Sequence, residues 1–166
     1  IEAASAGEGR GSRFTVRLPR RPAPAVTARS TATTPADAAP PCRILIVEDN
    51  DDAREMLRML LTLAGHQVYE AADGPGGVAM AQSVAPDLAF VDVGLPGFDG
   101  YEVARRLRAA SRDKAIALVS LTGYGRPEDR QRALEAGFDT HIVKPIDPGK
   151  LMAVIASTMA AGQSHR

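Results

Sequence analysis

From residue 42 onward the sequence repeats one pattern five times: a short run rich in Ile, Val and Leu, and then a longer segment with the apolar spacing of a helix. The runs show little alternation of polar and apolar residues, which is typical of strands buried on both faces. Strands that alternate with helices pair in parallel through right-handed crossovers, so helices cover both faces of one sheet. The sequence therefore predicts an α/β fold with a doubly wound, five-stranded parallel sheet. The predicted strands are residues 43–47, 67–71, 87–91, 115–121 and 139–143.

A helix is predicted after each strand. The first is the best marked, because Asn50 or Asp51 can cap its start, Gly65 ends it, and apolar residues recur between them at steps of three and four. The third is predicted to be capped by Asp99, and the fourth to end at Gly137. The other predicted helices cover residues 74–83, 101–110, 127–136 and 147–159.

The first 41 residues have a different character. Residues 20–41 are dominated by Pro, Ala, Thr and Ser, so we interpret them as a linker. Residues 13–18 alternate polar and apolar side chains after a glycine-rich stretch, which predicts a lone strand without a sheet to join in its own segment. The chain of 166 residues has room for one domain of ordinary size plus an appendage. Its start at Ile1 leads us to expect a fragment of a longer protein.

Charge and cysteine content narrow the function classes. The chain has 20 basic and 20 acidic residues, and its first 41 residues hold six arginines against three acids, which leaves 14 against 17 for the rest. A mildly acidic domain gives no reason to expect nucleic-acid binding. The single cysteine, Cys42, excludes a disulfide framework or thiolate metal site within the chain and favours a reducing, cytoplasmic setting. No apolar stretch approaches the roughly 18–20 residues of a membrane span, so we expect no membrane contact by this fragment, although its parent could be anchored.

Reactive or charged side chains stand where four of the predicted strands end: Glu48 and Asp49, Asp92, Thr122 and Lys144. The carboxyl ends of parallel strands meet at one edge of the sheet, so these side chains should converge. Three carboxylates in one crevice repel one another unless a cation is present, and oxygen ligands favour Mg²⁺ or Mn²⁺. A carboxylate nucleophile, a divalent ion, an ammonium group and a hydroxyl are what phosphoryl transfer to aspartate requires.

Four motifs then identify a resemblance. They are Ile-Leu-Ile-Val-Glu-Asp-Asn at 44–50, Phe-Val-Asp-Val-Gly-Leu-Pro-Gly-Phe-Asp-Gly at 90–100, Val-Ser-Leu-Thr-Gly at 119–123, and Ala-Gly-Phe-Asp-Thr-His-Ile-Val-Lys-Pro at 136–145. With them, the region from residue 42 to about 160 resembles a response-regulator receiver domain of two-component signalling, with residues 161–166 as a tail. The resemblance implies the flavodoxin-like (βα)5 fold with strand order 2-1-3-4-5, and a phosphorelay function in which Asp92 takes a phosphoryl group from phosphohistidine.

The resemblance also implies roles around Asp92. Asp92 and Asp49 would be direct Mg²⁺ ligands together with the carbonyl of Gly94, whereas Glu48 would act through water. Lys144 would contact the phosphoryl group and precede a cis proline.

Two further residues would transmit the signal. Thr122 would be the switch hydroxyl and would change the surface formed by the fourth helix, fifth strand and fifth helix. His141 stands where the family often has a rotating Tyr or Phe. It could couple to Thr122 in the same way, or it could make that surface respond to pH.

Residues 7–19 resemble the closing strand of a histidine-kinase ATP-binding domain, so we interpret residues 1–19 as its remnant. With the linker and receiver, this favours the C-terminal end of a hybrid sensor histidine kinase. The kinase's own nucleotide motifs are absent, so this fragment should not bind ATP. The expected partners are a histidine kinase, in cis, and a histidine phosphotransfer protein; phosphorylation-dependent dimerisation stays open.

Two other functions remain as alternatives. A phosphatase of the haloacid dehalogenase type also uses a strand-end aspartate with Mg²⁺, but it places a second acid two residues later, where this chain has Gly94. A receiver that only docks, without phosphorylation, is the other alternative. Whether the fragment is an enzyme is left open, since it would only assist its own phosphorylation and dephosphorylation. His66 and His165 are predicted to be exposed to solvent, and Cys42 to be a small residue at the start of a strand.

Overall fold

The computed structural model describes residues 2–5, 7, 9–17, 40–110, 116–123 and 127–163. The chain divides into two units, Ile1–Ala36 and Asp37–Arg166. His165 and most of the predicted linker lie outside the described residues.

The first unit is a hairpin. Strand β1 (Glu2–Ser5) pairs antiparallel with β2 (Ser12–Thr15), and the connection contains three glycines with positive φ, between 75° and 113°. The prediction of a lone strand is therefore wrong. The partner was missed because Glu-Ala-Ala-Ser has none of the β-branched or aromatic residues that mark a strand, and pairing with β2 decides its conformation. Phe14, 73% exposed, packs against no core in this hairpin.

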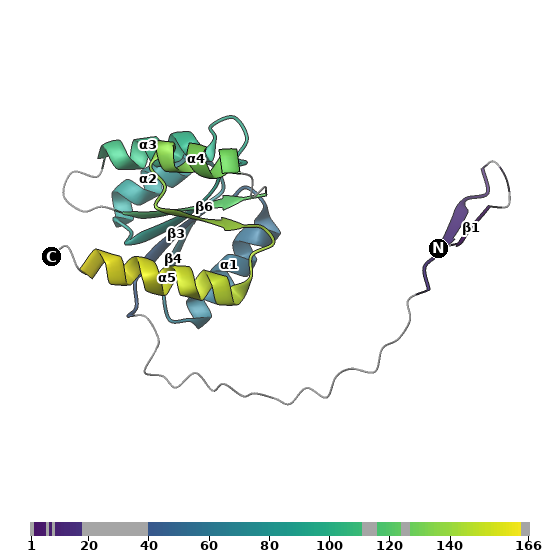
Figure 1. The fold of residues 1–166 in the computed structure, drawn as a ribbon, viewed down its shortest axis with the longest axis horizontal. Helices are drawn as coiled ribbons and strands as arrows, with labels where there is room; N and C mark the ends of the chain where they lie inside the picture. The colour runs from purple at the N-terminus through teal and green to yellow at the C-terminus, as the bar shows by residue number, and fades with distance from the viewer. Residues whose placement is uncertain are drawn as a thin grey trace, which may run out of the picture. The chain divides into compact units, whose positions relative to one another are not determined.

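The second unit confirms the predicted sheet (Figure 1). Its five strands are all parallel and lie in the order β4-β3-β5-β6-β7, which is the predicted order 2-1-3-4-5 within this unit. The strands are β3 (Arg43–Val47), β4 (Gln67–Ala71), β5 (Leu88–Asp92), β6 (Ala117–Thr122) and β7 (Thr140–Val143).

Helices cover both faces of this sheet (Figure 1). Ile44 and Ile46 of β3 pack toward α1 and α5, whereas Leu45 and Val47 pack toward α2, α3 and α4. Successive residues of one strand thus enter opposite cores, which explains the continuous apolar runs in the sequence. The helices are α1 (Asp51–Leu63), α2 (Gly74–Val84), α3 (Gly100–Ala110), α4 (Pro127–Ala136) and α5 (Pro148–Gln163).

The predicted end signals are confirmed. Asn50 Oδ1 accepts a hydrogen bond of 2.8 Å from Ala53 N at the start of α1, and Asp99 Oδ1 accepts one of 2.8 Å from Glu102 N at the start of α3. Gly65 follows the end of α1 with φ 88°. Such positive φ values disfavour residues with a Cβ, so this glycine stops the helix.

Two aspartates close the amino edge of the sheet. Asp87 Oδ2 accepts a hydrogen bond of 2.8 Å from Arg43 N, and Asp139 Oδ2 accepts one of 2.7 Å from Leu118 N. Their carboxylates satisfy amide groups of neighbouring strands. The strands that follow them, β5 and β7, begin one residue after the predicted starts.

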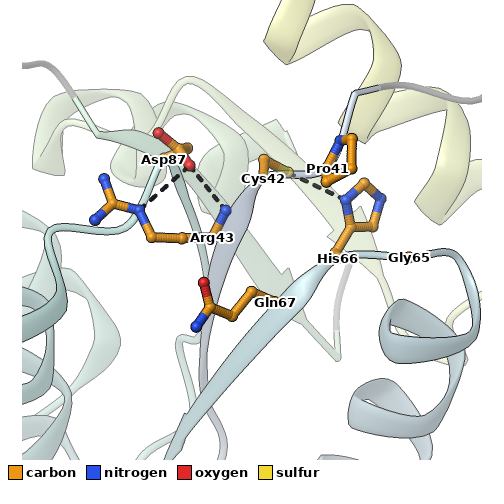
Figure 2. A pocket seen from close by; sticks show the side chains of 7 residues that line it. All are labelled: Pro41, Cys42, Arg43, Gly65, His66, Gln67 and Asp87. Carbon is orange, nitrogen blue, oxygen red and sulfur yellow. Dashed lines mark hydrogen bonds and ion pairs between the residues drawn. The ribbon is translucent and has the colours of Figure 1, made fainter.

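The prediction that His66 is exposed is wrong. Its side chain is buried at the amino edge of the sheet, and its Nδ1 lies 3.3 Å from Cys42 Sγ (Figure 2). The backbone explains this burial, because His66 N donates to Leu61 O and Gln67 N to Cys42 O, which turns the chain back over the start of β3. Burial raises the pKa of the Cys42 thiol to about 11 and lowers the pKa of His66.

No helix in the described ranges has both the length and the apolar character that crossing a membrane would require.

Candidate functional site at the carboxyl edge of the sheet

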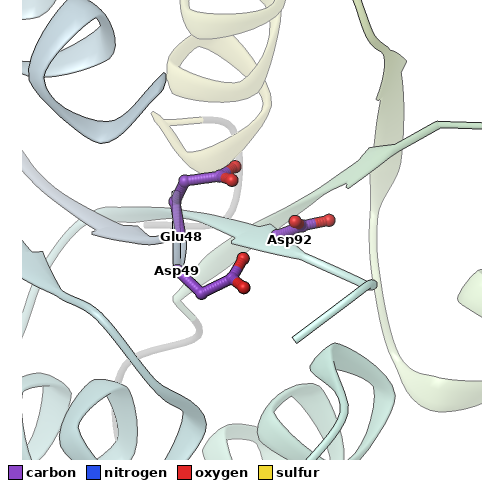
Figure 3. A group of neighbouring side chains, drawn as sticks. All are labelled: Glu48, Asp49 and Asp92. Atoms are coloured by element: carbon purple, nitrogen blue, oxygen red, sulfur yellow. The ribbon is translucent and has the colours of Figure 1, made fainter. Parts of the chain in front are cut away.

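The three acidic residues predicted at the strand ends lie together. One carboxylate oxygen from each of Glu48, Asp49 and Asp92 is within 4.8 Å of the others, and Figure 3 shows the three side chains grouped at the ends of β3 and β5. Glu48 and Asp92 are 1% and 8% exposed, whereas Asp49 is exposed. Two acids of the group are therefore buried, and the third faces solvent. A set of hard oxygen donors suits Mg²⁺ or Mn²⁺ and is unsuited to a metal that prefers thiolate or imidazole.

Lys144 supplies the counter-charge. Its Nζ donates to Glu48 Oε2 at 2.6 Å and to Asp92 Oδ2 at 2.8 Å. Its backbone N donates to Thr122 O at 2.8 Å, which fixes the residue after the end of β7, and the peptide bond to Pro145 is cis, as the resemblance implied. One ammonium group thus joins two carboxylates that come from different strands.

The electrostatics of Glu48 and Lys144 reflect this arrangement. Burial raises the pKa of Glu48, and the negative charge of Asp92 raises it further, while the hydrogen bond and charge of Lys144 oppose the rise without cancelling it. Burial lowers the pKa of Lys144, but the hydrogen bonds and charges of Asp92 and Glu48 outweigh that effect, so the pKa lies above its ordinary value. The ammonium group therefore stays charged at any physiological pH.

Asp92 is held by the loop that follows it. Gly94 N donates to Asp92 Oδ1 at 3.0 Å, and Val93 N donates to Leu121 O at 3.0 Å. Gly100, the first residue of α3, passes so close to the strand end that a Cβ there would lie 2.1 Å from the carbonyl oxygen of Asp92. Close approach of α3 is thus possible only because residue 100 is glycine.

Thr122 and His141 lie on neighbouring strands. Thr122 is the last residue of β6 and is buried. His141 is half-buried in β7 and is paired with Ser120, whereas Thr122 is paired with Val143. Residues two apart in a strand face the same side, and so do residues that are paired across neighbouring strands. His141 is paired with Ser120, two residues before Thr122, so the two predicted switch residues lie on the same face of the sheet.

One residue at the site was not found from the sequence. Arg54, in the first turn of α1, donates through Nη1 to the carbonyl oxygen of Glu48 at 2.7 Å. Helix periodicity marks it only as a polar residue, and a bond from a side chain to a backbone carbonyl leaves no signature in the sequence.

Comparison with known proteins agrees with this site and fold. Residues 44–156 match the response regulator receiver domain family. The transcriptional regulatory protein AfsQ1 of Streptomyces coelicolor is 38% identical over 120 residues, which are 72% of this chain and 52% of that protein. The phosphate regulon transcriptional regulatory protein PhoB of Escherichia coli is 40% identical over 117 residues, which are 70% of this chain and 51% of that protein. The chain thus spans about half the length of these regulators.

Solved structures show the same fold. The chemotaxis response regulator CheY4 of Vibrio cholerae superposes with a TM-score of 0.68 at 30% identity, covering 72% of this chain and 99% of that one. The receiver domain of the sensor histidine kinase PA1611 of Pseudomonas aeruginosa, which has a magnesium ion coordinated in its active site cleft, gives 0.67 at 28% identity, covering 73% and 99%. The sheet order, the strand-end acids and these matches together establish that the chain belongs to the response regulator receiver domain family of two-component signalling.

Proposed function

We propose that this receiver accepts a phosphoryl group on Asp92 from a phosphohistidine, in a reaction that depends on Mg²⁺. The observation that carries the proposal is the bridge from Lys144 Nζ to both Glu48 and Asp92, beside the exposed carboxylate of Asp49. The bridge provides a fixed cation next to a carboxylate nucleophile that is largely buried, with 8% of Asp92 exposed. Phosphoryl transfer depends mainly on such positioning and charge neutralisation.

In the proposed step an Asp92 carboxylate oxygen attacks the phosphorus atom. The new P–O bond forms as the P–N bond to the donor imidazole breaks, and the nitrogen keeps the bonding electron pair and later takes a proton from water. The Lys144 ammonium group, which already touches Asp92 Oδ2, is placed to contact the transferred oxygens. The Gly94 amide, bonded to Asp92 Oδ1, orients the nucleophile.

The donor set suits a divalent ion. Asp49, Asp92 and the carbonyl of Gly94 would hold Mg²⁺ directly, and Glu48 would do so through water. The ion would neutralise charge on the phosphoryl oxygens and the carboxylates. Mn²⁺ has the same preference for oxygen ligands and would serve as well.

Phosphorylation would be sensed by Thr122 and His141. A phosphoryl group on Asp92 adds negative charge and strong acceptor oxygens at the end of β5, where the neighbouring strand ends in the Thr122 hydroxyl. A movement of Thr122 would be passed to His141 on the same face of the sheet, and so to the surface formed by α4, β7 and α5.

We also propose which segments precede this receiver in the chain and which proteins exchange phosphoryl groups with it. Residues 1–19 would be the end of a histidine-kinase ATP-binding domain, joined by the linker at 20–41 to a receiver at 42–160 in the cytoplasm. The β1–β2 hairpin supports this, because a two-stranded hairpin is at best marginally stable alone and would gain stability in a larger sheet. The donor would be a kinase in cis, and a histidine phosphotransfer protein would be the next partner. The coding sequence upstream of Ile1 tests this: kinase nucleotide motifs there are expected.

Labelling tests the central proposal. The chain is incubated with Mg²⁺ and a ³²P-labelled phosphohistidine protein, and the product is checked for release by hydroxylamine, as an acyl phosphate requires. Asp92→Asn should abolish the label. Asp73→Asn, a change at an exposed helix cap where asparagine also caps, should leave it intact. Equal labelling of wild type and Asp92→Asn would refute the proposal.

The phosphatase alternative predicts a different result. Many turnovers of p-nitrophenyl phosphate in Mg²⁺ would support it, whereas a phosphoacceptor should show at most slow hydrolysis. Residue 94 is a glycine, so the second acid that such enzymes use for proton transfer is missing at that position.

A further inference from the structure

Arg54 connects three parts of the domain behind the acidic site. Its Nη1 donates to the Glu48 carbonyl oxygen at 2.7 Å, its Nη2 to Asp51 Oδ1 at 2.5 Å, and its Nε lies 3.7 Å from Glu70 Oε1 on β4. The side chain is 17% exposed although it is an arginine in the first turn of a surface helix. Its position is thus fixed from several directions.

The bond to the Glu48 carbonyl holds the peptide group that precedes Asp49. That carbonyl belongs to the planar peptide group that joins Glu48 to Asp49. A hydrogen bond that holds its oxygen therefore also fixes the plane that contains Asp49 N. The amide of Glu48 is held as well, since Glu48 N donates to Ala71 O at 3.1 Å. Both backbone polar groups of Glu48 are therefore anchored outside the loop.

Asp49 depends on this anchoring more than the other acids do. The side chains of Glu48 and Asp92 bond to Lys144, whereas that of Asp49 is exposed and makes no hydrogen bond or ion pair with another described residue. Among the residues that the structure describes, no side chain holds this carboxylate, so the Asp49 backbone sets its position.

Arg54 does not act as a counter-ion for the site. Within the part of the chain that the structure describes, its guanidinium contacts Asp51, Glu70 and the backbone of Glu48, and none of the three site carboxylates. Its positive charge is balanced by two acids outside the site. An effect on metal binding would therefore pass through the loop.

We propose that Arg54 is a positioning residue: its hydrogen bond to the Glu48 carbonyl holds the Glu48–Asp49 peptide so that the Asp49 carboxylate is ready to bind a divalent cation. This inference rests on the proposed Mg²⁺ function of the site. It adds a residue that touches neither the metal nor the phosphoryl group.

The test compares Arg54→Gln with Arg58→Gln in the full 166-residue chain. Arg58 lies one turn further along α1 and also pairs with Glu70, but its other contacts go to Glu55 and not to the loop. Both variants lose one positive charge and one ion pair within α1 from the same network, but only Arg54→Gln also loses a bond to the Glu48 carbonyl. Arg54→Lys keeps the charge and serves if the glutamine variant does not fold.

Two measurements are made on each variant. Calorimetric titration with Mg²⁺ alone should show affinity about tenfold weaker for Arg54→Gln, the low end of the effect of residues that orient metal ligands, and within about twofold of wild type for Arg58→Gln. In metal-free protein, the ¹⁵N–¹H heteronuclear NOE of the Asp49 amide should fall in Arg54→Gln and stay unchanged in Arg58→Gln. Arg54→Lys, with one donor group in place of a fork, should weaken Mg²⁺ affinity by about threefold.

Other outcomes overturn the inference. Equal losses of Mg²⁺ affinity in the two glutamine variants would show that Arg54 acts only through charge. An unchanged Asp49 amide in Arg54→Gln would show that the loop does not need the bond. If the wild-type chain failed to bind Mg²⁺, the proposed function would fail, and the metal-free NOE would still decide whether Arg54 orders Asp49.

Discussion

Replacing Lys144 by methionine is expected to destabilise the domain at neutral pH and much less in mild acid. Methionine keeps an unbranched apolar stem but removes the ammonium group that lies 2.6 Å from Glu48 Oε2 and 2.8 Å from Asp92 Oδ2. The Glu48 carboxylate, 1% exposed, then stands beside a second buried carboxylate without a cation. Removing one partner of a buried ion pair generally costs about 3–5 kcal/mol.

Proton uptake by Glu48 limits how much unfolding free energy the variant can lose through this residue. At pH 7 the variant can protonate Glu48 at a cost of about 3.4 kcal/mol, because pH 7 is 2.5 units above the ordinary pKa of 4.5 and each unit corresponds to about 1.36 kcal/mol. At pH 5 the same limit is about 0.7 kcal/mol. The pKa of Glu48 is already raised in the wild type, so the difference between the two proteins is smaller than each limit. We expect a loss of about 2–3 kcal/mol at pH 7 and less than about 1 kcal/mol at pH 5.

Urea unfolding in EDTA at the two pH values measures this difference. Lys150→Met is the matched control, because Lys150 is exposed and its side chain makes no hydrogen bond or ion pair with another described residue. Its stability should stay within about 0.5 kcal/mol of the wild type at both pH values. A loss in Lys144→Met that is the same at pH 5 and pH 7 would refute the reasoning, since it would come from packing and not from an unpaired carboxylate.

Gly100→Ala should unfold the domain or lower its unfolding free energy by more than about 3 kcal/mol, because the new Cβ would lie 2.1 Å from the Asp92 carbonyl oxygen. Gly97→Ala, at φ 74° with no atom within 4 Å of the new Cβ, should lower it by about 1 kcal/mol. Circular dichroism during urea unfolding compares the two variants. Cys42 should react with Ellman's reagent at pH 8 at least about 100-fold more slowly in folded than in urea-unfolded protein, since burial raises its pKa from 9.0 to about 11, and equal rates would contradict this. The pKa of His66 is lowered by burial, so its contribution to stability is present above pH 6.5 and is lost as the pH falls through the pKa of the folded state. Between pH 7 and pH 5, His66→Gln should therefore lose less unfolding free energy than the wild type. An equal loss in both proteins would argue against this.

The sheet and most of the site could be predicted because topology brings them together. Once five apolar runs alternate with helices, right-handed crossovers fix parallel pairing, and the residues that end the strands must meet. Asp92 and Thr122 are in fact the last residues of β5 and β6, and Lys144 directly follows β7. No side-chain geometry was needed for that inference.

The failures share a different cause. Burial of His66 depends on how the chain after α1 returns over Cys42, and formation of β1 depends on pairing with β2. Neither feature can be predicted from local propensity or periodicity. The contact of Arg54 with the Glu48 carbonyl is also non-periodic, because it depends on the angle between α1 and the loop that precedes it. Contacts of this kind are decided by tertiary placement.

The bridge made by Lys144 ties the stability of the fold to its chemistry. In the metal-free domain one ammonium group serves two buried carboxylates, and the raised pKa of Glu48 shows that this compensation is incomplete. If Lys144 turns toward a phosphoryl group on Asp92, the Glu48 side chain loses its hydrogen bond to the ammonium group while the local negative charge increases. A second cation near Asp49 would then be needed to keep Glu48 ionised in the interior. The same physical requirement, neutralisation of Glu48, thus links the metal dependence that we propose to the pH dependence expected of Lys144→Met.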